Sequence, residues 1–329
     1  MDVSNAQTLD TSLTEPPSYL LFCGDLVKNE ENDTAATLKS QLAAWTPLWT
    51  ASALYAQDKT YLVPIAGNHE MLISSNSGQE YLASTDCNDA AWLNWISTNT
   101  LFPTGDKVNS GPNTGTGNAD KLASSLESQM SYSFDVGDLH FIVLNTDAFN
   151  SYSSPSQGAS AVGWIALNWL TSDIQTAQAN TNTSLIFVFG HKPIVPTDPN
   201  VPTDSTSIYN YSDDNLAAQF QTVMRSNSKV VGYFCAHAHL WQFSSLSSGA
   251  NPQPVQVIAG NAGSPLEGSW SPGGSLGPYF GWTLVKVLQD GTVQVENFGR
   301  TAPSNVWGAP ASGNPTLINQ ETAYVPSGP

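Results

Sequence analysis

Four of the five histidines in the chain follow short apolar segments, and each of the four lies beside or near a glycine, an asparagine or another histidine. A further apolar segment leads directly into Gly24-Asp25. Carboxylate, amide oxygen and neutral imidazole are ligands for zinc, manganese or iron. A carboxylate such as Asp25 can bridge two cations, and a pair about 3.5–4 Å apart stabilises an in-line displacement at phosphorus. The residues with this chemistry are Asp25, Asn68, His69, His191, His237 and His239.

An apolar segment of strand length precedes each of these polar groups. Open α/β sheets form binding sites where loops leave the carboxyl ends of strands, so we expect the groups to meet there. His237 and His239 are two residues apart, which predicts that they point to the same side of an extended segment. The predicted strands are Tyr19–Cys23, Tyr61–Ala66, Leu139–Leu144, Leu185–Phe189, Val230–Cys235, Val255–Ala259, Trp282–Val287 and Val293–Asn297. The predicted helices are Thr37–Ala56, Ala90–Ser97, Gly163–Ala179 and Asn215–Ser226.

The alternation of strands and helices predicts an α/β fold, with the later strands forming a second, more antiparallel sheet. The 329 residues carry 10 Lys and Arg against 27 Asp and Glu, a net charge of −17. This charge repels nucleic-acid phosphates, so we expect no nucleic-acid partner. No segment reaches the roughly 20 apolar residues that a membrane-spanning helix needs, so we expect no membrane partner either. The charged fraction is only 11%, a composition that favours a secreted or periplasmic location.

Each motif alone also has an ordinary structural interpretation. Gly24-Asp25 and Gly67-Asn68 are common in turns, and a lone histidine such as His191 is more often a core or surface residue. We predict that His140, with no partner nearby in the sequence, is structural. Cys23 and Cys235 lie in apolar segments, which predicts small buried side chains. The metal-site hypothesis therefore depends on the motifs occurring together at separate strand ends.

The ordered set GD, GNHE, GH and HxH resembles the signature of the calcineurin-like metallophosphoesterase superfamily. Met130–Gly137, followed by His140–Asp147, resembles a strand pair of the purple acid phosphatase-like branch. The resemblance implies a four-layer αββα sandwich of two mixed sheets flanked by helices. It extends from Asp2 to about Arg300, so we expect a catalytic domain over residues 1–300 and a Pro/Gly/Ser-rich tail over 301–329.

The resemblance also implies a role for each matching residue. Asp25 would bridge two metal ions, zinc, manganese or iron, and a hydroxide shared by the ions would attack a phosphomonoester or small phosphodiester. His69 would face this small phosphorylated substrate and protonate the leaving oxygen or hold the phosphate. Lys192, beside His191, is a candidate contact for the substrate phosphate, as is Lys28. The implied metal ligands are Asp2, Asp25, Asn68, His191, His237 and His239.

The chain departs from the family pattern in its first motif. Only Met1 precedes Asp2, where the family has an apolar strand, so we expect an N-terminally truncated chain with a gap or unpaired edge in the first sheet. Ser4 stands in place of the D-x-H histidine, and Lys28 stands where the purple branch has a metal-binding tyrosine. A protonated lysine cannot bind a cation. These departures keep an alternative open, a degenerate family member that binds a ligand or partner without catalysis.

Overall fold

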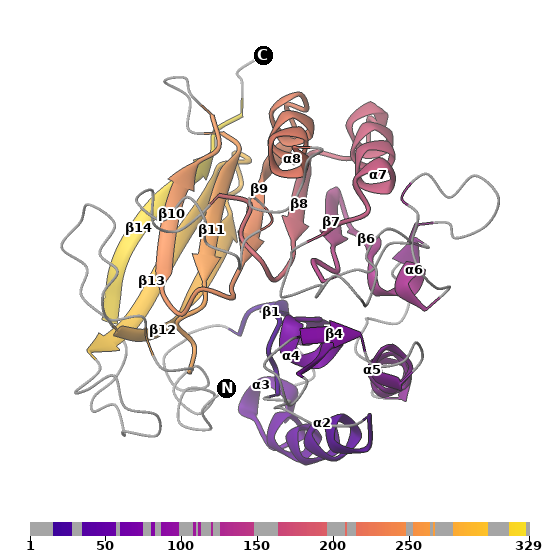
Figure 1. The fold of residues 1–329 in the computed structure, drawn as a ribbon. Helices are drawn as coiled ribbons and strands as arrows, with labels where there is room; N and C mark the ends of the chain where they lie inside the picture. The colour runs from indigo at the N-terminus through magenta and orange to yellow at the C-terminus, as the bar shows by residue number, and fades with distance from the viewer. Residues whose placement is uncertain are drawn as a thin grey trace.

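The structure is a computed structural model (Figure 1). It describes residues 16–27, 35–56, 60–74, 80–82, 87–98, 108–109, 111–112, 120, 126–147, 164–195, 208, 215–247, 253–263, 266, 279–301 and 316–326.

A seven-stranded mixed sheet forms the centre of the molecule, in the order β10-β11-β9-β8-β7-β6-β5. The four strands β11, β9, β8 and β7 are parallel to one another, while β10, β6 and β5 pair antiparallel at the two sides. The bounds are β5 Val108–Asn109, β6 Tyr132–Val136, β7 Leu139–Val143, β8 Leu185–Phe189, β9 Val230–Cys235, β10 Trp241–Ser245 and β11 Val255–Ala259.

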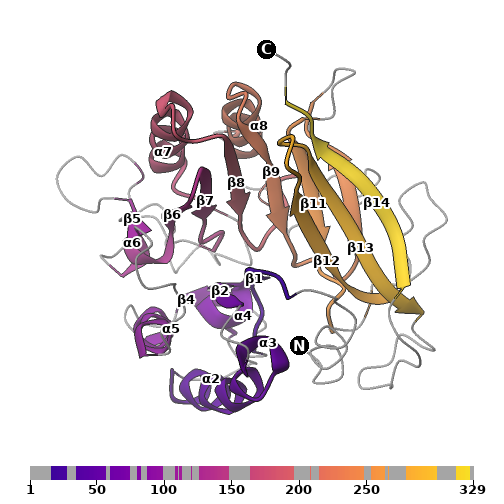
Figure 2. The same cartoon turned by 180° about the vertical axis from the view of Figure 1, so that it is seen from behind.

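A second β-layer packs against one face of this sheet. It contains the parallel pair β1 (Tyr19–Cys23) and β2 (Tyr61–Ile65). It also contains the antiparallel sheet β12-β13-β14, which both views place beside β11 (Figure 2). A short antiparallel pair, β3 and β4, follows β2. The remaining bounds are β3 Leu72–Ser74, β4 Glu80–Leu82, β12 Tyr279–Val287, β13 Val293–Thr301 and β14 Thr316–Tyr324.

Helices cover the two outer faces. Figure 1 shows α7 (Leu167–Ala179) and α8 (Leu216–Arg225) on the opposite side of the sheets from α2, α3 and α5. The layers are therefore helix, sheet, sheet, helix, which confirms the predicted αββα sandwich. None of the helices in the described part of the chain is long and apolar enough to cross a membrane. The other helices are α2 Ala35–Thr50, α3 Ala53–Ala56, α4 Asn68–Met71, α5 Cys87–Thr98 and α6 Glu127–Met130.

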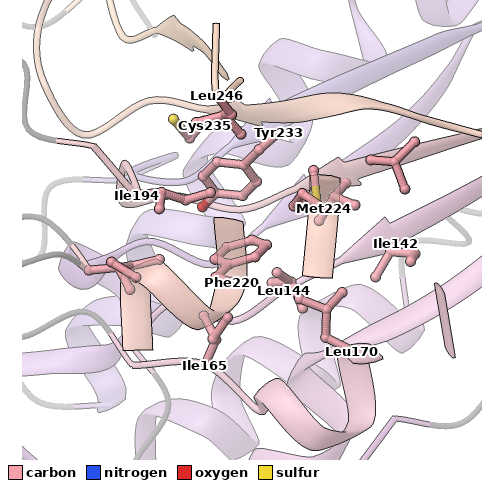
Figure 3. Packing of buried hydrophobic residues seen from close by; sticks show 14 of the residues in the cluster. Ile142, Leu144, Ile165, Leu170, Ile194, Phe220, Met224, Tyr233, Cys235 and Leu246 are labelled. Carbon is pink, nitrogen blue, oxygen red and sulfur yellow. The ribbon is translucent and has the colours of Figure 1, made fainter. Parts of the chain in front are cut away.

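The pleat of β8 shows why its sequence is apolar at every position. Leu185, Phe187 and Phe189 face the core between the two sheets. Ile186 and Val188 face the helices, in the cluster that also contains Leu170 of α7 and Phe220 of α8 (Figure 3). Successive side chains point to opposite faces of a strand, so a strand buried on both faces needs a continuous apolar run.

Helix α7 receives its N-terminal cap from a distant part of the chain. The carboxylate of Asp120 accepts hydrogen bonds from the backbone N–H of Asn168 at 2.7 Å and of Trp169 at 3.0 Å. Asp120 is buried, and Ala166 at the N-cap position makes no side-chain cap. Free N–H groups at a helix start favour a negative charge, so this contact fixes Asp120 at the start of the helix.

The eight predicted strands all form strands, and the four predicted helical regions all contain helix. The first predicted helix is divided, because α2 ends at Thr50 and α3 starts at Ala53. The structure describes only part of the tail expected over residues 301–329. Its residues Thr316–Tyr324 form β14, which pairs along β13, so this part of the tail belongs to the second β-layer. The division of domains at residue 300 stays a prediction.

Candidate metal centre

Four of the predicted site residues meet at the carboxyl ends of four strands. Asp25 follows β1, Asn68 begins α4 just after β2, His191 follows β8, and His237 follows β9. The site therefore lies where the β1-β2 pair meets the seven-stranded sheet. Donor atoms of Asp25, His191 and His237 all lie within 4.8 Å of one another, which makes this trio a candidate for holding a metal ion.

The contacts among the donor atoms are close. His191 Nε2 lies 2.9 Å from Asn68 Oδ1 and 3.2 Å from Asp25 Oδ2. His237 Nδ1 lies 3.0 Å from Asn68 Oδ1 and 3.0 Å from His191 Nε2. One carboxylate oxygen, one amide oxygen and two imidazole nitrogens thus point at one small region. This is the mixed oxygen and nitrogen donor set that borderline divalent cations accept.

The His191 ring is oriented by the strand that carries Asp25. Its Nδ1 lies 2.7 Å from the carbonyl oxygen of Cys23, so Nδ1–H donates there and Nε2 faces the other donors. This approach needs glycine at position 24, where φ is +90° and a Cβ would lie only 2.2 Å from His191 Nδ1. Glycine 24 therefore serves both the turn and the close approach of the ring.

Asp25 and His237 have left-handed backbones, with φ of 55° and 64°. The expectation of an extended His237–His239 segment is therefore wrong. The N–H of Ala238 donates to the carbonyl of Ala236 at 2.8 Å, which closes a three-residue turn centred on His237. Residues with a Cβ adopt this conformation at a cost, and such strain is characteristic of functional sites.

Glu70 holds together the two loops that carry Asp25 and Asn68. Its buried carboxylate accepts hydrogen bonds from the backbone N–H of Asp25 at 3.0 Å, of Val27 at 3.0 Å and of Gly67 at 2.8 Å. Burial, followed by the charge of Asp25, raises the pKa of Glu70 to about 7 against the opposing effect of the N–H groups of Val27 and Gly67. In the sequence Glu70 is visible only as the last letter of GNHE, and its role depends on burial.

Asp25 and His191 stabilise each other's charged form, whereas His191 disfavours the charged form of His237. Burial opposes ionisation of Asp25, but the charge and hydrogen bond of His191 outweigh it and hold the pKa of Asp25 below its usual range. Burial likewise opposes protonation of His191, yet Asp25 raises the pKa of His191 to about 9. Burial and the charge of His191 hold the pKa of His237 well below its usual value. His237 is therefore neutral at pH 7, which leaves a ring-nitrogen lone pair for a cation.

The other predicted site residues have different placements. His69 lies in α4, and its backbone N–H donates to Asp25 Oδ1 at 3.1 Å. His239 is partly buried and close enough for its charge to lower the pKa of His237, but it is not part of the three-residue donor group. Asp2 and Lys28 lie outside the described residues.

Lys192 needs a correction, because its side chain faces the protein interior. Its ammonium group is completely buried and forms an ion pair with the buried carboxylate of Asp147. This placement argues against the expected contact between Lys192 and a substrate phosphate. A lysine next to a predicted ligand in sequence does not have to share its direction.

His140 also differs from expectation, since it has two partners. Its Nδ1 lies 2.5 Å from Asp135 Oδ1, and its Nε2 lies 2.9 Å from Asp173 Oδ2. Ser133 donates to the other oxygen of Asp173 at 3.0 Å. These contacts link β6, β7 and α7, so the predicted structural role of His140 fits them. The expectation that His140 has no partner nearby is wrong.

Comparison with known proteins places this fold and site in a family. The family model for calcineurin-like phosphoesterases matches residues 4–241, well over half of the 329 residues. The chain belongs to the calcineurin-like phosphoesterase family. The four strand ends that carry the donor residues of this family member all lie within the matched range.

A solved structure shares this fold. A structure of PhoD superimposes with a TM-score of 0.59 at 11% identity, covering 96% of this calcineurin-like chain and 68% of PhoD. A dimetal phosphatase from Danio rerio also matches, with a TM-score of 0.40 and 13% identity over 88% of this chain and 96% of that one. No curated protein matches the chain.

Proposed function

We propose that this calcineurin-like chain is a metal-dependent phosphoesterase that hydrolyses phosphomonoesters or small phosphodiesters with the help of two divalent cations. The observation that carries the proposal is the convergence of Asp25, Asn68, His191 and His237 from four separate strand ends. Zinc, manganese and iron all suit these donors. A place in the purple acid phosphatase-like branch and a secreted or periplasmic location are further parts of the proposal.

The donor atoms fit a cation better than they fit one another. His191 Nε2, His237 Nδ1 and Asn68 Oδ1 lie at 2.9–3.0 Å in a nearly closed triangle. If one ring nitrogen donates to the other, the accepting nitrogen has no proton to give to the amide oxygen, so the three contacts cannot all be hydrogen bonds at the same time. A cation that displaces the proton of His191 would be attracted by both ring nitrogens, the amide oxygen and the Asp25 carboxylate.

In this proposal Asn68, His191 and His237 would hold one cation, and Asp25 would contribute to both. His239 and Asp2 would be the remaining ligands for the second cation. The cations, when bound, supply activation of water and neutralisation of the phosphoryl oxygens. His69 faces the substrate and gives a proton to the leaving oxygen or holds the phosphate. Its backbone N–H, bonded to Asp25, keeps α4 beside the site.

The test is to remove one donor at a time and measure both metal content and turnover. Asn68→Ala and His237→Ala are expected to lose most of the bound Mn²⁺ or Zn²⁺ and to reduce hydrolysis of an aryl phosphate to background. Asn319→Ala, which makes the same deletion on β14, is expected to keep both. Unchanged turnover in either donor variant, with the variant still folded, would reject the assignment.

The alternative of a non-catalytic family member makes a different prediction. The metal-ligating group found in the described residues, Asp25 with His191 and His237, suffices for one cation. A binding protein would take up one cation per chain and show no rate above buffer with free metal. Metal analysis of the purified protein, combined with mono- and diester aryl phosphate assays, separates one cation without turnover from two cations with turnover.

A further inference from the structure

A buried ion pair involves Lys192, the residue next to His191 in the chain. The ammonium group of Lys192 is fully buried and pairs with the carboxylate of Asp147, which is also almost entirely removed from solvent. Lys192 follows His191 in the chain, and Asp147 lies beyond the end of β7, the strand next to β8. The pair therefore lies one residue from a predicted metal ligand, and both of its charged groups are removed from solvent.

The backbone of Lys192 is held from both sides. Its N–H donates to Thr146 Oγ1 at 3.0 Å, and its carbonyl accepts from the buried hydroxyl of Tyr233 at 2.7 Å. Thr146 in turn donates to the second oxygen of Asp147 at 3.3 Å. Three strands, β7, β8 and β9, thus contribute to one closed set of contacts around a single peptide.

The packing around this peptide leaves little freedom. A Cβ at Gly190 would lie 2.3 Å from the hydroxyl of Tyr233 and 2.7 Å from Cγ2 of Thr146. The turn from Gly190 to Lys192 is therefore pressed against Tyr233 while the His191 ring reaches across to Cys23 at 2.7 Å. A small rotation of this turn moves the ring nitrogen away from Asn68.

We propose that Lys192, through its ion pair with Asp147 and the hydroxyl of Tyr233, is a positioning residue that fixes the His191 imidazole for metal binding. The inference rests on the proposed function. A buried ion pair costs desolvation and is often no more stabilising than apolar residues of similar volume, so its presence needs a reason other than stability. Removing a residue that supports a metal ligand typically lowers metal affinity or activity about 10–100-fold.

The competing explanation is that the pair only contributes to packing. Variants that separate folding from metal binding distinguish the two. Tyr233→Phe removes one hydroxyl and keeps the ring, and Tyr324→Phe makes the same deletion at a buried tyrosine on β14. Lys192→Met leaves the Asp147 carboxylate buried without its partner, whereas the double variant Lys192→Met with Asp147→Leu removes both charges together.

The experiment measures three quantities for each variant: the unfolding midpoint, the affinity for Mn²⁺ and Zn²⁺ by calorimetry, and kcat and KM for an aryl phosphate. Tyr233→Phe is expected to fold and to bind each cation about 10-fold more weakly, while Tyr324→Phe binds as the wild type does. Lys192→Met is expected to lose stability. The double variant is expected to regain stability while its metal affinity stays at least about 10-fold below the wild type.

The outcomes separate this inference from the proposed function. A Tyr233→Phe variant with wild-type metal affinity, or a double variant whose affinity recovers together with its stability, would show that the contacts serve packing alone. Either result overturns the positioning role and leaves the phosphoesterase proposal standing. A wild-type chain that binds neither cation and shows no turnover overturns both.

Discussion

The left-handed backbone of His237 predicts that the site is built at a cost in stability. His237 has φ of 64°, a conformation that glycine adopts freely. We compare His237→Gly with His237→Ala in metal-free protein. Both variants delete the imidazole and its contacts with Asn68 and His191, so their difference reports the backbone.

The magnitude follows from the conformation. A residue with a Cβ pays roughly 1–2 kcal/mol in the left-handed region, and glycine loses about 0.5–1 kcal/mol more entropy on folding. His237→Gly is therefore expected to exceed His237→Ala in free energy of unfolding by about 1 kcal/mol. For a chain of 329 residues this corresponds to a difference in Tm of about 1.5 °C.

The assay is denaturant unfolding supported by calorimetry, and both variants are expected to lose phosphatase activity. His69 is the matched control, because it lies in the single helical turn α4 and does not have a positive φ. There the order reverses, and His69→Ala is expected to be more stable than His69→Gly by up to about 1 kcal/mol. If His237→Ala proves as stable as His237→Gly, the strain argument is wrong.

Three more predictions follow from buried polar contacts. Burial opposes protonation of His140, but its bonds to Asp173 and Asp135 raise its pKa. The stability that His140 adds is therefore full below the unfolded pKa of about 6.5 and falls as pH rises through the higher folded pKa. Denaturant titrations should show the difference in unfolding free energy between wild type and His140→Gln closing at alkaline pH, and a constant difference would refute this. Asp120→Ala removes the distant cap of α7 and is expected to lower the free energy of unfolding, measured with denaturant, by about 1–2 kcal/mol. Asp120→Asn should partly restore it. An unchanged free energy in Asp120→Ala would mean that the cap does not stabilise α7. Glu70→Gln replaces a carboxylate that accepts from three N–H groups by an amide, and it is expected to lower the free energy of unfolding by about 1–3 kcal/mol. It is also expected to weaken Mn²⁺ binding; chemical unfolding measures the first effect and calorimetry the second. Wild-type stability and affinity would exclude Glu70 as the link between the two loops.

Local sequence patterns predict the strands that carry the site. Leu185–Phe189 and Val230–Cys235 are apolar at nearly every position, and the structure places both in the middle of the large sheet with the predicted bounds. Strand β14 was missed because Thr316–Tyr324 is largely polar and forms a strand only by pairing with β13. Strand β10, with the sequence WQFSS, has the same weak signal and depends on β11.

For the site, the residue types and their place after strands predict candidate donors, and the structure brings Asp25, Asn68, His191 and His237 together. Their convergence depends on contacts across long stretches of chain, since Asn68 and His237 are 169 residues apart. The inward direction of Lys192 and the positive φ of His237 are set by burial and by neighbours on other strands. Short patterns encode which chemistry a chain carries and whether a segment is extended, whereas side-chain direction and charge pairing arise only when distant segments pack together.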